Sequence, residues 1–484
     1  MKVLFIYPEF IKGCNYLPPQ YYEGIACLSA VLKKNNHEVK LIHLVHDVNA
    51  EVFIQEIKDF SPGLIGFSAL SNSFTEVKKY ARIAKEYLKV PVICGGIHAT
   101  VMPEEVISEK SIDFVCIGEG ELPILELAKR LEGNEDTRGI LNIWAKDGEA
   151  IYRNHCRKPI DNLNALPFPD RSIFDFNHLF SSQEGAASFY FSRGCIYNCS
   201  YCCSSTLRKN NIVPFRYKDA ALLVSEIKET IEKYNYIRYI SFGGDILPPD
   251  RHWLEEFTFH YTQKVNLLFS CNIHPLEVNR QTAGLLKKAR CNCVNIGVET
   301  GDDDLLQGLL RRSITTREIL ARCRILDEAG IKIVTYNMVG LPFEDSKKIL
   351  KTVKLNAEIK PARIRKSIFC PYPGSDSFKI CRDMNLISQD TFGGHGAQTI
   401  LNFPRKKKEE ITFFHRYFRF IVKLYILSEN FPHLVKLWDK LFISGRLPYR
   451  ILTGYYDCIL SIANFIYPKL LVKFFPRRVI YRVA

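Results

Sequence analysis

The chain has 484 residues, of which 47% are hydrophobic and 24% charged, a globular composition that excludes a disordered or fibrous protein. Its net charge of +14 is concentrated in residues 401–484, which excludes a nucleic-acid binder that is basic throughout, and no nucleic-acid partner is expected. Sixteen cysteines in so long a chain exclude a small disulfide scaffold.

The first residues, MKVLFIYPEF, lack the apolar run and the small-residue cleavage site of a signal peptide. We therefore expect a cytoplasmic protein with reduced thiols, in which clustered cysteines bind metal or do chemistry more often than they form disulfides. No spanning helix is expected, because the closest apolar stretch, Cys458 to Phe475, is interrupted by Asn464, Pro468 and Lys469.

Residues 1–135 alternate β-rich runs with amphipathic helical runs. This alternation predicts parallel βαβ units and an α/β domain with a doubly wound, Rossmann-like sheet. A ligand of such a sheet binds beyond the carboxyl ends of the strands, and no GxGxxG motif follows the first strand to favour a dinucleotide. The expected strands are Val3–Tyr7, Glu38–Leu44, Leu64–Ala69, Val90–Cys94 and Phe114–Ile117, and the expected helices include Gly24–Asn35, Ala50–Phe60, Ser73–Tyr87 and Glu121–Leu131.

Three further regions follow along the chain. Residues 136–185 contain Pro167 and Pro169 among polar residues and are expected to be a linker. Residues 186–385 repeat the strand–helix alternation six times, which predicts a partial (β/α)6 barrel of the TIM type with its chemistry at the carboxyl ends of the strands. Residues 386–484 lose the strand pattern and are expected to be mostly helical, for example at Phe413–Ser428 and Leu434–Phe442. The expected barrel strands are Ser188–Ser192, Arg238–Phe242, Leu267–Cys271, Val294–Val298, Lys332–Met338 and Ile364–Cys370.

A cysteine triad follows the first barrel strand. Cys195, Cys199 and Cys202 have the spacing Cys-x3-Cys-x2-Cys, and three thiolates so close together can bind one iron–sulfur cluster. A cube of four irons held by three cysteines keeps one iron open for a substrate or cofactor, as reactive metal sites do. A zinc site is the alternative, although no Cys or His follows at the spacing of a zinc ribbon.

The triad, with the aromatic Tyr201 just before its last cysteine, resembles the signature of the radical S-adenosylmethionine (radical SAM) enzymes. Residues 1–135 look like the cobalamin (B12)-binding domain that is often fused to them, so the resemblance covers residues 1–385. It implies that the three cysteines are the metal ligands and catalytic residues of a [4Fe–4S] cluster, with S-adenosylmethionine bound to its open iron.

Strand ends of the barrel match further family segments in the same order. The resemblance implies that Gly243, Gly244 and Asp245 bind the methionine amino group, although Glu is more usual than Asp at the third position. It also implies that Glu299 lies near the ribose and that the segment containing Gly340 packs on adenine. The other candidate cofactor contacts are Tyr201, Ser270 or Asn272, and Arg312, for which a solvated helix charge is the alternative.

Two interpretations of residues 1–135 remain open. In one they bind cobalamin, through residues that match the fused domain: Ser68, Ser71, Gly95, Gly96, His98, Gly118 and Glu119. The motif Asp-x-His-x-x-Gly that ligates cobalt is absent, so cobalt can lack a lower protein ligand. In the other, the domain only packs on the barrel or recognises substrate.

The basic, aromatic C-terminal region also has two interpretations. It either caps the barrel with its charges solvated, or forms a peripheral surface for the inner face of a membrane or for a lipid-like substrate. The contact points would be Arg405–Lys408 and Phe474–Arg478.

The resemblance implies an enzyme that cleaves S-adenosylmethionine reductively to a 5′-deoxyadenosyl radical, with electrons from a flavodoxin- or ferredoxin-type reductase. With cobalamin, the expected reaction is methylation of an unactivated carbon in a small-molecule or lipid-like substrate. The alternatives are a cobalamin-dependent cyclase or rearrangement enzyme, a non-catalytic sensor that binds the cluster or cobalamin, and a zinc protein.

Overall fold

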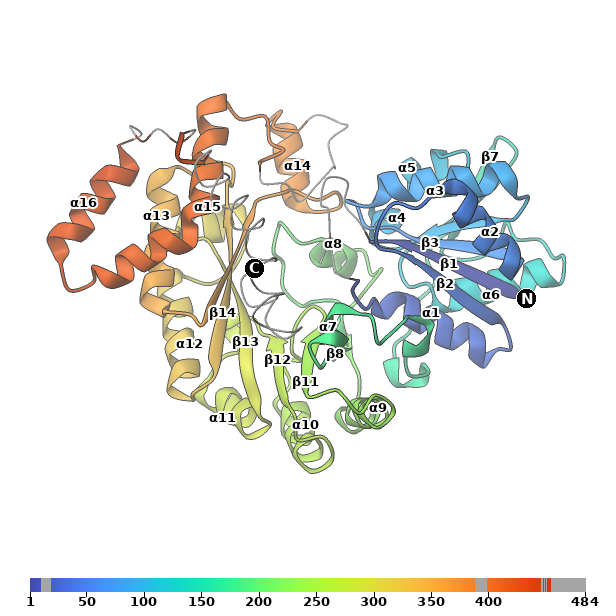
Figure 1. Cartoon of the computed structure of the whole chain (residues 1–484), viewed down its shortest axis with the longest axis horizontal. Helices are drawn as coiled ribbons and strands as arrows, with labels where there is room; N and C mark the ends of the chain where they lie inside the picture. The colour runs from blue at the N-terminus through green and yellow to red at the C-terminus, as the bar shows by residue number, and fades with distance from the viewer. Residues whose placement is uncertain (10–18, 388–397, 445–446, 448, 450, 454–484) are drawn as a thin grey trace, which may run out of the picture.

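The structure is a computed structural model, and it describes residues 1–9, 19–387, 398–444, 447, 449 and 451–453. Sheets of seven and six strands contain most of its β-structure. They lie side by side in Figure 1, the first in blue and the second in green to orange, and the C-terminal helices cover the outer end of the second.

The N-terminal sheet has the strand order β2-β1-β3-β4-β5-β6-β7, and its first five strands are parallel. The strand order reverses between β1 and β3, and ligands of such sheets bind at this point, beyond the carboxyl ends of the strands. The predicted doubly wound sheet is confirmed, with every predicted strand within two residues of the observed one. The parallel strands are β1 (Lys2–Pro8), β2 (Glu38–Leu44), β3 (Leu64–Ser68), β4 (Val92–Gly95) and β5 (Phe114–Cys116).

Helices cover both faces of this sheet, as its apolar strands require. On β1, Val3 and Phe5 face one core and Leu4 and Ile6 face the other. The first core contains α1 (Glu23–Lys34) and α6 (Glu121–Glu132) and continues into the barrel. The second contains α2 (Ala50–Phe60), α3 (Phe74–Tyr87), α4 (Ile97–Val101) and α5 (Pro103–Ser108).

The expected linker 136–185 is in part a continuation of the first sheet, which corrects the prediction. β6 (Ile143–Asp147) and β7 (Ala150–Arg153) form an antiparallel hairpin beside β5, and Gly148 supplies the positive φ of the turn. Both strands mix apolar with charged residues, which hides the alternation in the sequence. The rest of the region has only short helical turns: η1 (Leu163–Ala165), η2 (Arg171–Ile173) and α7 (Phe180–Gln183).

The second sheet confirms the predicted partial barrel. Its six strands are parallel in the order β15-β14-β13-β12-β11-β8, so β8 and β15 are open edges. Helices line its outer side (Figure 1). The strands are β8 (Ala186–Tyr190), β11 (Tyr239–Gly243), β12 (Leu268–Asn272), β13 (Cys291–Glu299), β14 (Lys332–Val339) and β15 (Arg363–Ile368). The helices are α9 (Ala220–Lys233), α10 (Arg251–Lys264), α11 (Arg280–Lys288), α12 (Thr316–Glu328) and α13 (Ser346–Ile359), with the turns η3 (Pro275–Glu277) and η4 (Asp304–Leu309).

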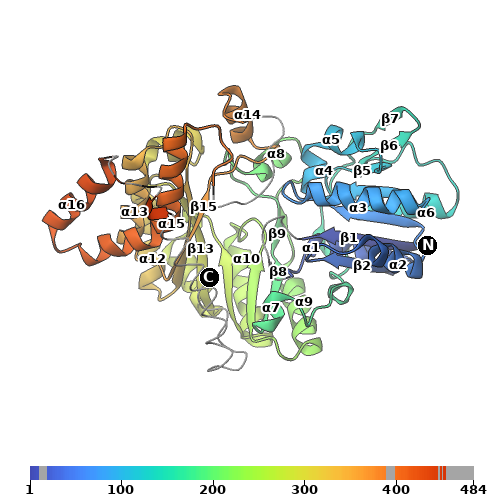
Figure 2. The ribbon, with the colours of Figure 1, turned by 45° about the horizontal axis from the view of Figure 1, so that its top comes forward.

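A two-stranded ribbon lies where the barrel meets the N-terminal domain (Figure 2). It pairs β9 (Ser192–Arg193) with β10 (Arg216–Tyr217) in antiparallel register. The cysteine loop and α8 (Cys203–Lys209) lie between these two strands in the sequence, and α14 (Asp376–Asp383) follows the last barrel strand.

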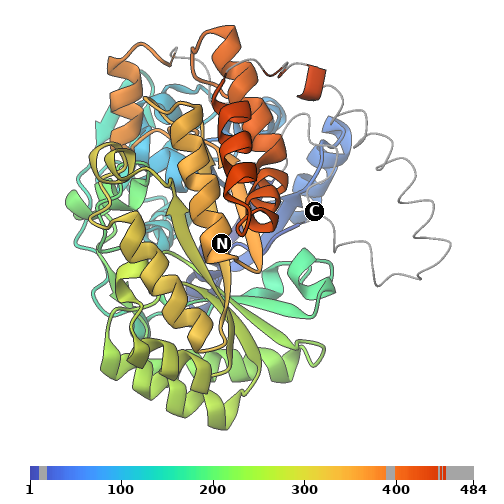
Figure 3. The same ribbon diagram turned by 90° about the vertical axis from the view of Figure 1, so that its left-hand side faces the viewer.

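The C-terminal region is helical as predicted, with α15 (Arg405–Leu427) and α16 (Pro432–Ile443). α15 lies beside α13 on the outside of the barrel (Figure 3) and buries Phe414 and Phe418 against Ile349 and Val353. Arg405–Lys408 form the start of α15, whereas Phe474–Arg478 lie outside the described residues. Within the described part of the chain, no helix is both long enough and apolar enough to cross a membrane.

Candidate active site

A cavity of about 430 Å³ opens at the carboxyl ends of the barrel strands, within the range of about 300–1,000 Å³ that is typical of ligand sites. Its wall combines the loop after β9 with the ends of β11 to β15. The polar residues that line it are Cys195, Tyr197, Cys199, Tyr201, Cys202, Ser204, Ser205, Asp245, Asn272, His274, Asn295, Glu299, Arg312, Tyr336, Asn337 and Ser367.

All three predicted cysteine ligands line this cavity, whereas Cys203 does not. The loop is folded on itself, because the Ser205 hydroxyl donates to the carbonyl oxygens of Cys199 and Cys202. It is also tied to the barrel by Ser200, whose N–H and hydroxyl donate to two backbone carbonyls near the end of η4, at 3.0 and 2.6 Å. The sequence spacing thus brings the three thiols to one wall.

Asp245 lines the same cavity just beyond the end of β11, where the Ser204 hydroxyl donates to its carboxylate at 2.8 Å. Burial raises the pKa of this carboxyl. The two glycines before it do not line the cavity. A Cβ on Gly243, the last residue of β11, would come within 3.1 Å of the Tyr190 ring, and Gly244 has a φ of 91°.

Glu299 ends β13 in a left-handed backbone conformation, with a φ of 64°. Such a conformation is uncommon for a residue with a side chain, and strained residues of this kind cluster at functional sites. The Tyr201 hydroxyl donates to its carboxylate at 3.2 Å. Burial raises the pKa of Glu299, and the nearby Arg312 charge opposes this shift.

Two aromatic side chains of this wall were not predicted from the sequence. His274 and Tyr197 stack with ring centroids 3.5 Å apart, and the Tyr197 hydroxyl donates to Glu277. Burial, reinforced by the Arg312 charge, lowers the pKa of His274 to about 3, so its imidazole is neutral at ordinary pH. The available signal was the position of His274, two residues beyond β12, where a polar side chain reaches the mouth of a barrel.

Arg312 lies in the wall and is not a solvated helix charge. Its side chain is buried, Nη1 donates to the carbonyl of Gly297 at 2.6 Å, and Nη2 lies 3.2 Å from His274 Nε2.

Besides Gly243 and Gly244, two further predicted barrel residues lie outside the cavity. Ser270 is one layer deeper in the barrel than Asn272, which occupies the wall instead. Gly340 faces away from the cavity and toward α15, because a Cβ on Gly340 would come within 2.9 Å of the Ile411 side chain. Asn337 and Met338, from the same segment, line the cavity in its place.

A second cavity, of about 210 Å³, lies at the carboxyl ends of the N-terminal strands, at the switch point of the sheet. Six of its nineteen lining residues are glycines, which leaves backbone exposed along its wall. It brings together Ser68, Gly95, Gly96, Gly118 and Glu119 of the predicted residues, and the barrel contributes Arg193.

Ser71 and His98 are not part of this second cavity. His98 is buried against Phe74, and its Nδ1 lies 3.1 Å from the Ser71 hydroxyl. Burial, followed by the Lys78 charge, lowers the pKa of His98 to about 4. No histidine is among the described residues that line the cavity, so none of them offers an imidazole ligand from its wall.

The lining of the first cavity fits an iron–sulfur cluster and that of the second fits a corrin, the two cofactors that the resemblance implies. Three thiols with no fourth cysteine among the described lining residues suit a cube with one open iron. Within the described residues, no three His, Cys, Asp or Glu side chains, the three cysteines included, lie close enough together to hold a single metal ion. The second cavity combines six glycines, which let backbone approach a ligand closely, with apolar side chains such as Phe5 and Tyr22, and such a wall suits a broad, flat ring such as a corrin.

Comparison with protein families gives two matches. Residues 22–128 match the model of the B12 binding domain, and residues 189–355 match that of the radical SAM superfamily. Both matches fall inside the predicted domains 1–135 and 186–385.

Similar proteins cover most of the chain. An uncharacterized methyltransferase of Pyrococcus horikoshii is 24% identical over 80% of this chain and 84% of its own. The anaerobic magnesium-protoporphyrin IX monomethyl ester cyclase of Rubrivivax gelatinosus is 23% identical over 78% of this chain and 70% of its own. Among solved structures, the cobalamin-dependent S-adenosylmethionine radical enzyme OxsB with aqua-cobalamin bound shares the fold, with a TM-score of 0.70, 15% identity, and coverage of 96% of this chain and 75% of its own. The chain therefore belongs to the radical SAM enzymes that carry an N-terminal B12-binding domain.

Proposed function

We propose that this chain is a cobalamin-dependent radical SAM methyltransferase that methylates an unactivated carbon. The observation that carries the proposal is the adjacency of its two cavities. Arg193 lines the glycine-lined cavity and Cys195, two residues later, lines the cysteine cavity. A corrin and a cluster held at these places would lie on either side of one short segment.

When bound, the cluster with S-adenosylmethionine supplies radical chemistry for hydrogen abstraction, and methylated cobalamin supplies the methyl group. The protein binds, orients and excludes water. Cys195, Cys199 and Cys202 would hold the cluster, and the Asp245 and Glu299 carboxylates are placed to accept hydrogen bonds from amino and hydroxyl groups. Neutral His274 adds an aromatic wall without a second positive charge beside Arg312.

Cyclisation is the second candidate reaction, because one relative named above is a cyclase. The two reactions consume S-adenosylmethionine differently. A methyltransferase must take its methyl groups from this molecule and leave S-adenosylhomocysteine, whereas a cyclase need release only 5′-deoxyadenosine.

The test is an anaerobic assay of the reconstituted protein with hydroxocobalamin, S-adenosylmethionine and a chemical reductant. Release of both 5′-deoxyadenosine and S-adenosylhomocysteine supports methyl transfer. Release of 5′-deoxyadenosine alone favours the cyclase, and release of neither from a protein that holds both cofactors favours a sensor.

We further propose that α16 contacts an anionic membrane surface. Of its side chains only Phe442 is buried, and the helix projects from the outer end of the molecule (Figure 1). Its solvent side carries Leu437 (52% exposed) and Leu441 (39% exposed) beside the exposed Lys436 and Lys440. Apolar side chains interleaved with lysines suit the interface of an anionic bilayer.

Sedimentation with vesicles tests this surface. The parent should bind vesicles of phosphatidylglycerol and phosphatidylcholine, and K436E/K440E should lose this binding, since each lysine near such a surface contributes about 1 kcal/mol. The control K233E/K288E reverses two exposed charges on α9 and α11 and should bind like the parent. Equal binding by the two double variants would contradict the proposal, as would no binding by the parent.

A further inference from the structure

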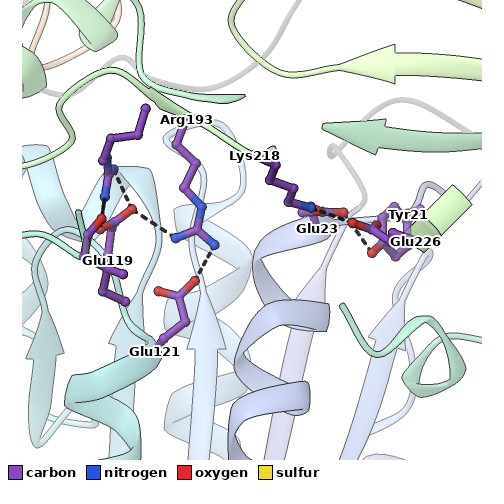
Figure 4. Close-up of polar contacts among 9 residues, drawn as sticks. Tyr21, Glu23, Glu119, Glu121, Arg193, Lys218 and Glu226 are labelled. Carbon is purple, nitrogen blue, oxygen red and sulfur yellow. Dashed lines mark hydrogen bonds and ion pairs between the residues drawn. The ribbon is translucent and has the colours of Figure 1, made fainter. Parts of the chain in front are cut away.

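Opposite charges meet where the N-terminal domain contacts the barrel (Figure 4). The acidic side chains come from the ends of the N-terminal elements, and the basic ones come from or directly follow the β9–β10 ribbon. The acidic residues are Glu23, Glu119 and Glu121, and the basic residues are Arg193, Arg216 and Lys218.

Arg193 joins two of these carboxylates. Its Nη1 donates to Glu119 Oε1 at 3.0 Å, and its Nη2 donates to Glu121 Oε1 at 2.5 Å. Arg216, paired with Arg193 across the ribbon, donates to both oxygens of Glu119 at 2.8 and 2.9 Å. The guanidinium fork suits this geometry, because it presents several donors in one plane.

Glu119 shows the electrostatic effect of this contact. Its burial acts to raise its pKa, but hydrogen bonds and charge from Arg216 and Arg193 outweigh this and hold the pKa below its ordinary value. The acidic partners are well shielded, with 11% of the Glu119 side chain and 5% of the Glu121 side chain exposed. Removal of one partner from such a contact leaves the other charge buried and unpaired.

Lys218 extends the contact to α1. Its Nζ lies 2.7 Å from Glu226 Oε2 on the barrel and 3.5 Å from Glu23 Oε1, at the start of α1. Glu23 also accepts a hydrogen bond from the Tyr21 hydroxyl at 3.0 Å. The two domains are thus held at two separate places, by Arg193 at one and by Lys218 at the other (Figure 4).

The backbone leaves little room for the two domains to slide. Gly118, directly before Glu119, has a φ of 80°, and a Cβ there would come within 2.9 Å of the Ile212 side chain of the barrel. Within the barrel, Gly194, directly after Arg193, has a φ of 75°, and a Cβ there would come within 2.7 Å of the Pro214 carbonyl oxygen, so the strand that carries Arg193 packs closely on the segment before β10.

We propose that Arg193 is a positioning residue that fixes the distance between the corrin and the cluster. Its charge holds the loop Gly118–Glu121, which lines the corrin cavity, against the strand that leads into Cys195. This inference rests on the proposed function, because it assigns the glycine-lined cavity to the corrin. It adds that the corrin site is shared: it is complete only when the barrel contributes Arg193.

The test compares R193Q, E121Q, R193Q/E121Q and R193K with the parent and with R82Q. Arg82, whose own side chain is 65% exposed, makes a bidentate pair with Glu109 inside the N-terminal domain, so R82Q removes a similar pair away from the interface. Two readouts need no turnover: hydroxocobalamin retained after gel filtration, and the rate of trypsin cleavage of the cofactor-free protein. A third is the ratio of S-adenosylhomocysteine to 5′-deoxyadenosine released.

R193Q should retain cluster absorbance but hold hydroxocobalamin at least about tenfold more weakly, since truncation of a buried charge pair costs this much or more. Trypsin should cleave it faster, and its product ratio should fall, because S-adenosylmethionine cleavage continues while methyl transfer slows. R193K should recover part of the loss, and the double variant should be no worse than R193Q. R82Q should match the parent.

Parent-like retention, cleavage and product ratio in R193Q would overturn the proposal, as would equal losses in R82Q. If R193Q does not fold, E121Q gives the same comparison from the other side of the pair, and R193K gives it with the positive charge retained. If the parent itself retains no hydroxocobalamin, the proposed function fails, and the trypsin rates of the cofactor-free proteins still decide whether Arg193 docks the two domains.

Discussion

Glu344 shows at the residue scale how burial controls charge in this protein. Its carboxylate accepts hydrogen bonds from the backbone N–H groups of Gly340 and Leu341, at 2.6 and 3.2 Å, just beyond β14. Only 4% of the residue is exposed, and burial raises its pKa from 4.5 to about 7 in spite of these bonds. The folded protein therefore binds this proton more tightly than the unfolded chain does.

The stabilisation linked to this proton is present in full below about pH 4.5 and is lost as the pH rises through about 7. E344Q removes the titration, so the free energy of unfolding of the parent should fall relative to E344Q by up to about 3 kcal/mol between about pH 5 and 8. Urea unfolding across this range measures the difference. The exposed Glu358 provides the control E358Q, and a parallel pH profile for parent and E344Q would refute the assignment.

Residues predicted from a motif and residues predicted from position alone fared differently. The cysteine spacing is a property of one loop, so the sequence could place all three thiols on one wall. Ser270 and Gly340 were inferred from strand ends, where a shift of two residues along a strand changes the layer of the barrel that a side chain occupies. The residues of these strands that line the cavity are therefore Asn272, Asn337 and Met338.

At the scale of elements, α15 shows how the basic C-terminal region can also be a structural part of the barrel. Phe418 is fully buried in the core that α15 shares with α13, whereas Phe420, two residues later, is 57% exposed. The helix therefore packs an apolar face on the barrel, although its sequence is basic.

Two aromatic substitutions separate these faces. F418A should lower the free energy of unfolding by about 3–5 kcal/mol, because it leaves a cavity in a packed core. F420A should change it by less than about 0.5 kcal/mol, as is usual for surface positions. Urea unfolding monitored by circular dichroism measures both, and equal losses would show that the C-terminal region packs otherwise than described here.

The success of strand prediction depended on hydrophobic content. Parallel strands such as β1 and β3 are buried on both faces, so they appear in the sequence as apolar runs that are easily recognised. The hairpin of β6 and β7 lies at the sheet edge and contains Lys146, Asp147 and Arg153, so its alternation was too weak to distinguish it from a linker.

At the scale of the whole molecule, the sequence could predict the order and type of the domains but not their contact. Each domain has its own strand–helix periodicity and its own motifs. The pairing of Arg193 with Glu119 and Glu121 joins residues more than 70 positions apart, and no local pattern marks such a pair. For the same reason, the adjacency of the two cavities emerged only from the folded chain.

The central claim is that three cysteines hold an iron–sulfur cube whose fourth iron is open to S-adenosylmethionine. The most direct test is the electron paramagnetic resonance spectrum of the reduced, reconstituted protein, recorded before and after addition of S-adenosylmethionine. C203A is the matched control for C199A, because Cys203 adjoins the loop but does not line the cavity. We predict that the parent and C203A give a cluster signal that changes when S-adenosylmethionine binds, and that C199A gives no cluster signal. A parent signal that S-adenosylmethionine leaves unchanged, or a signal that survives in C199A, would contradict the account.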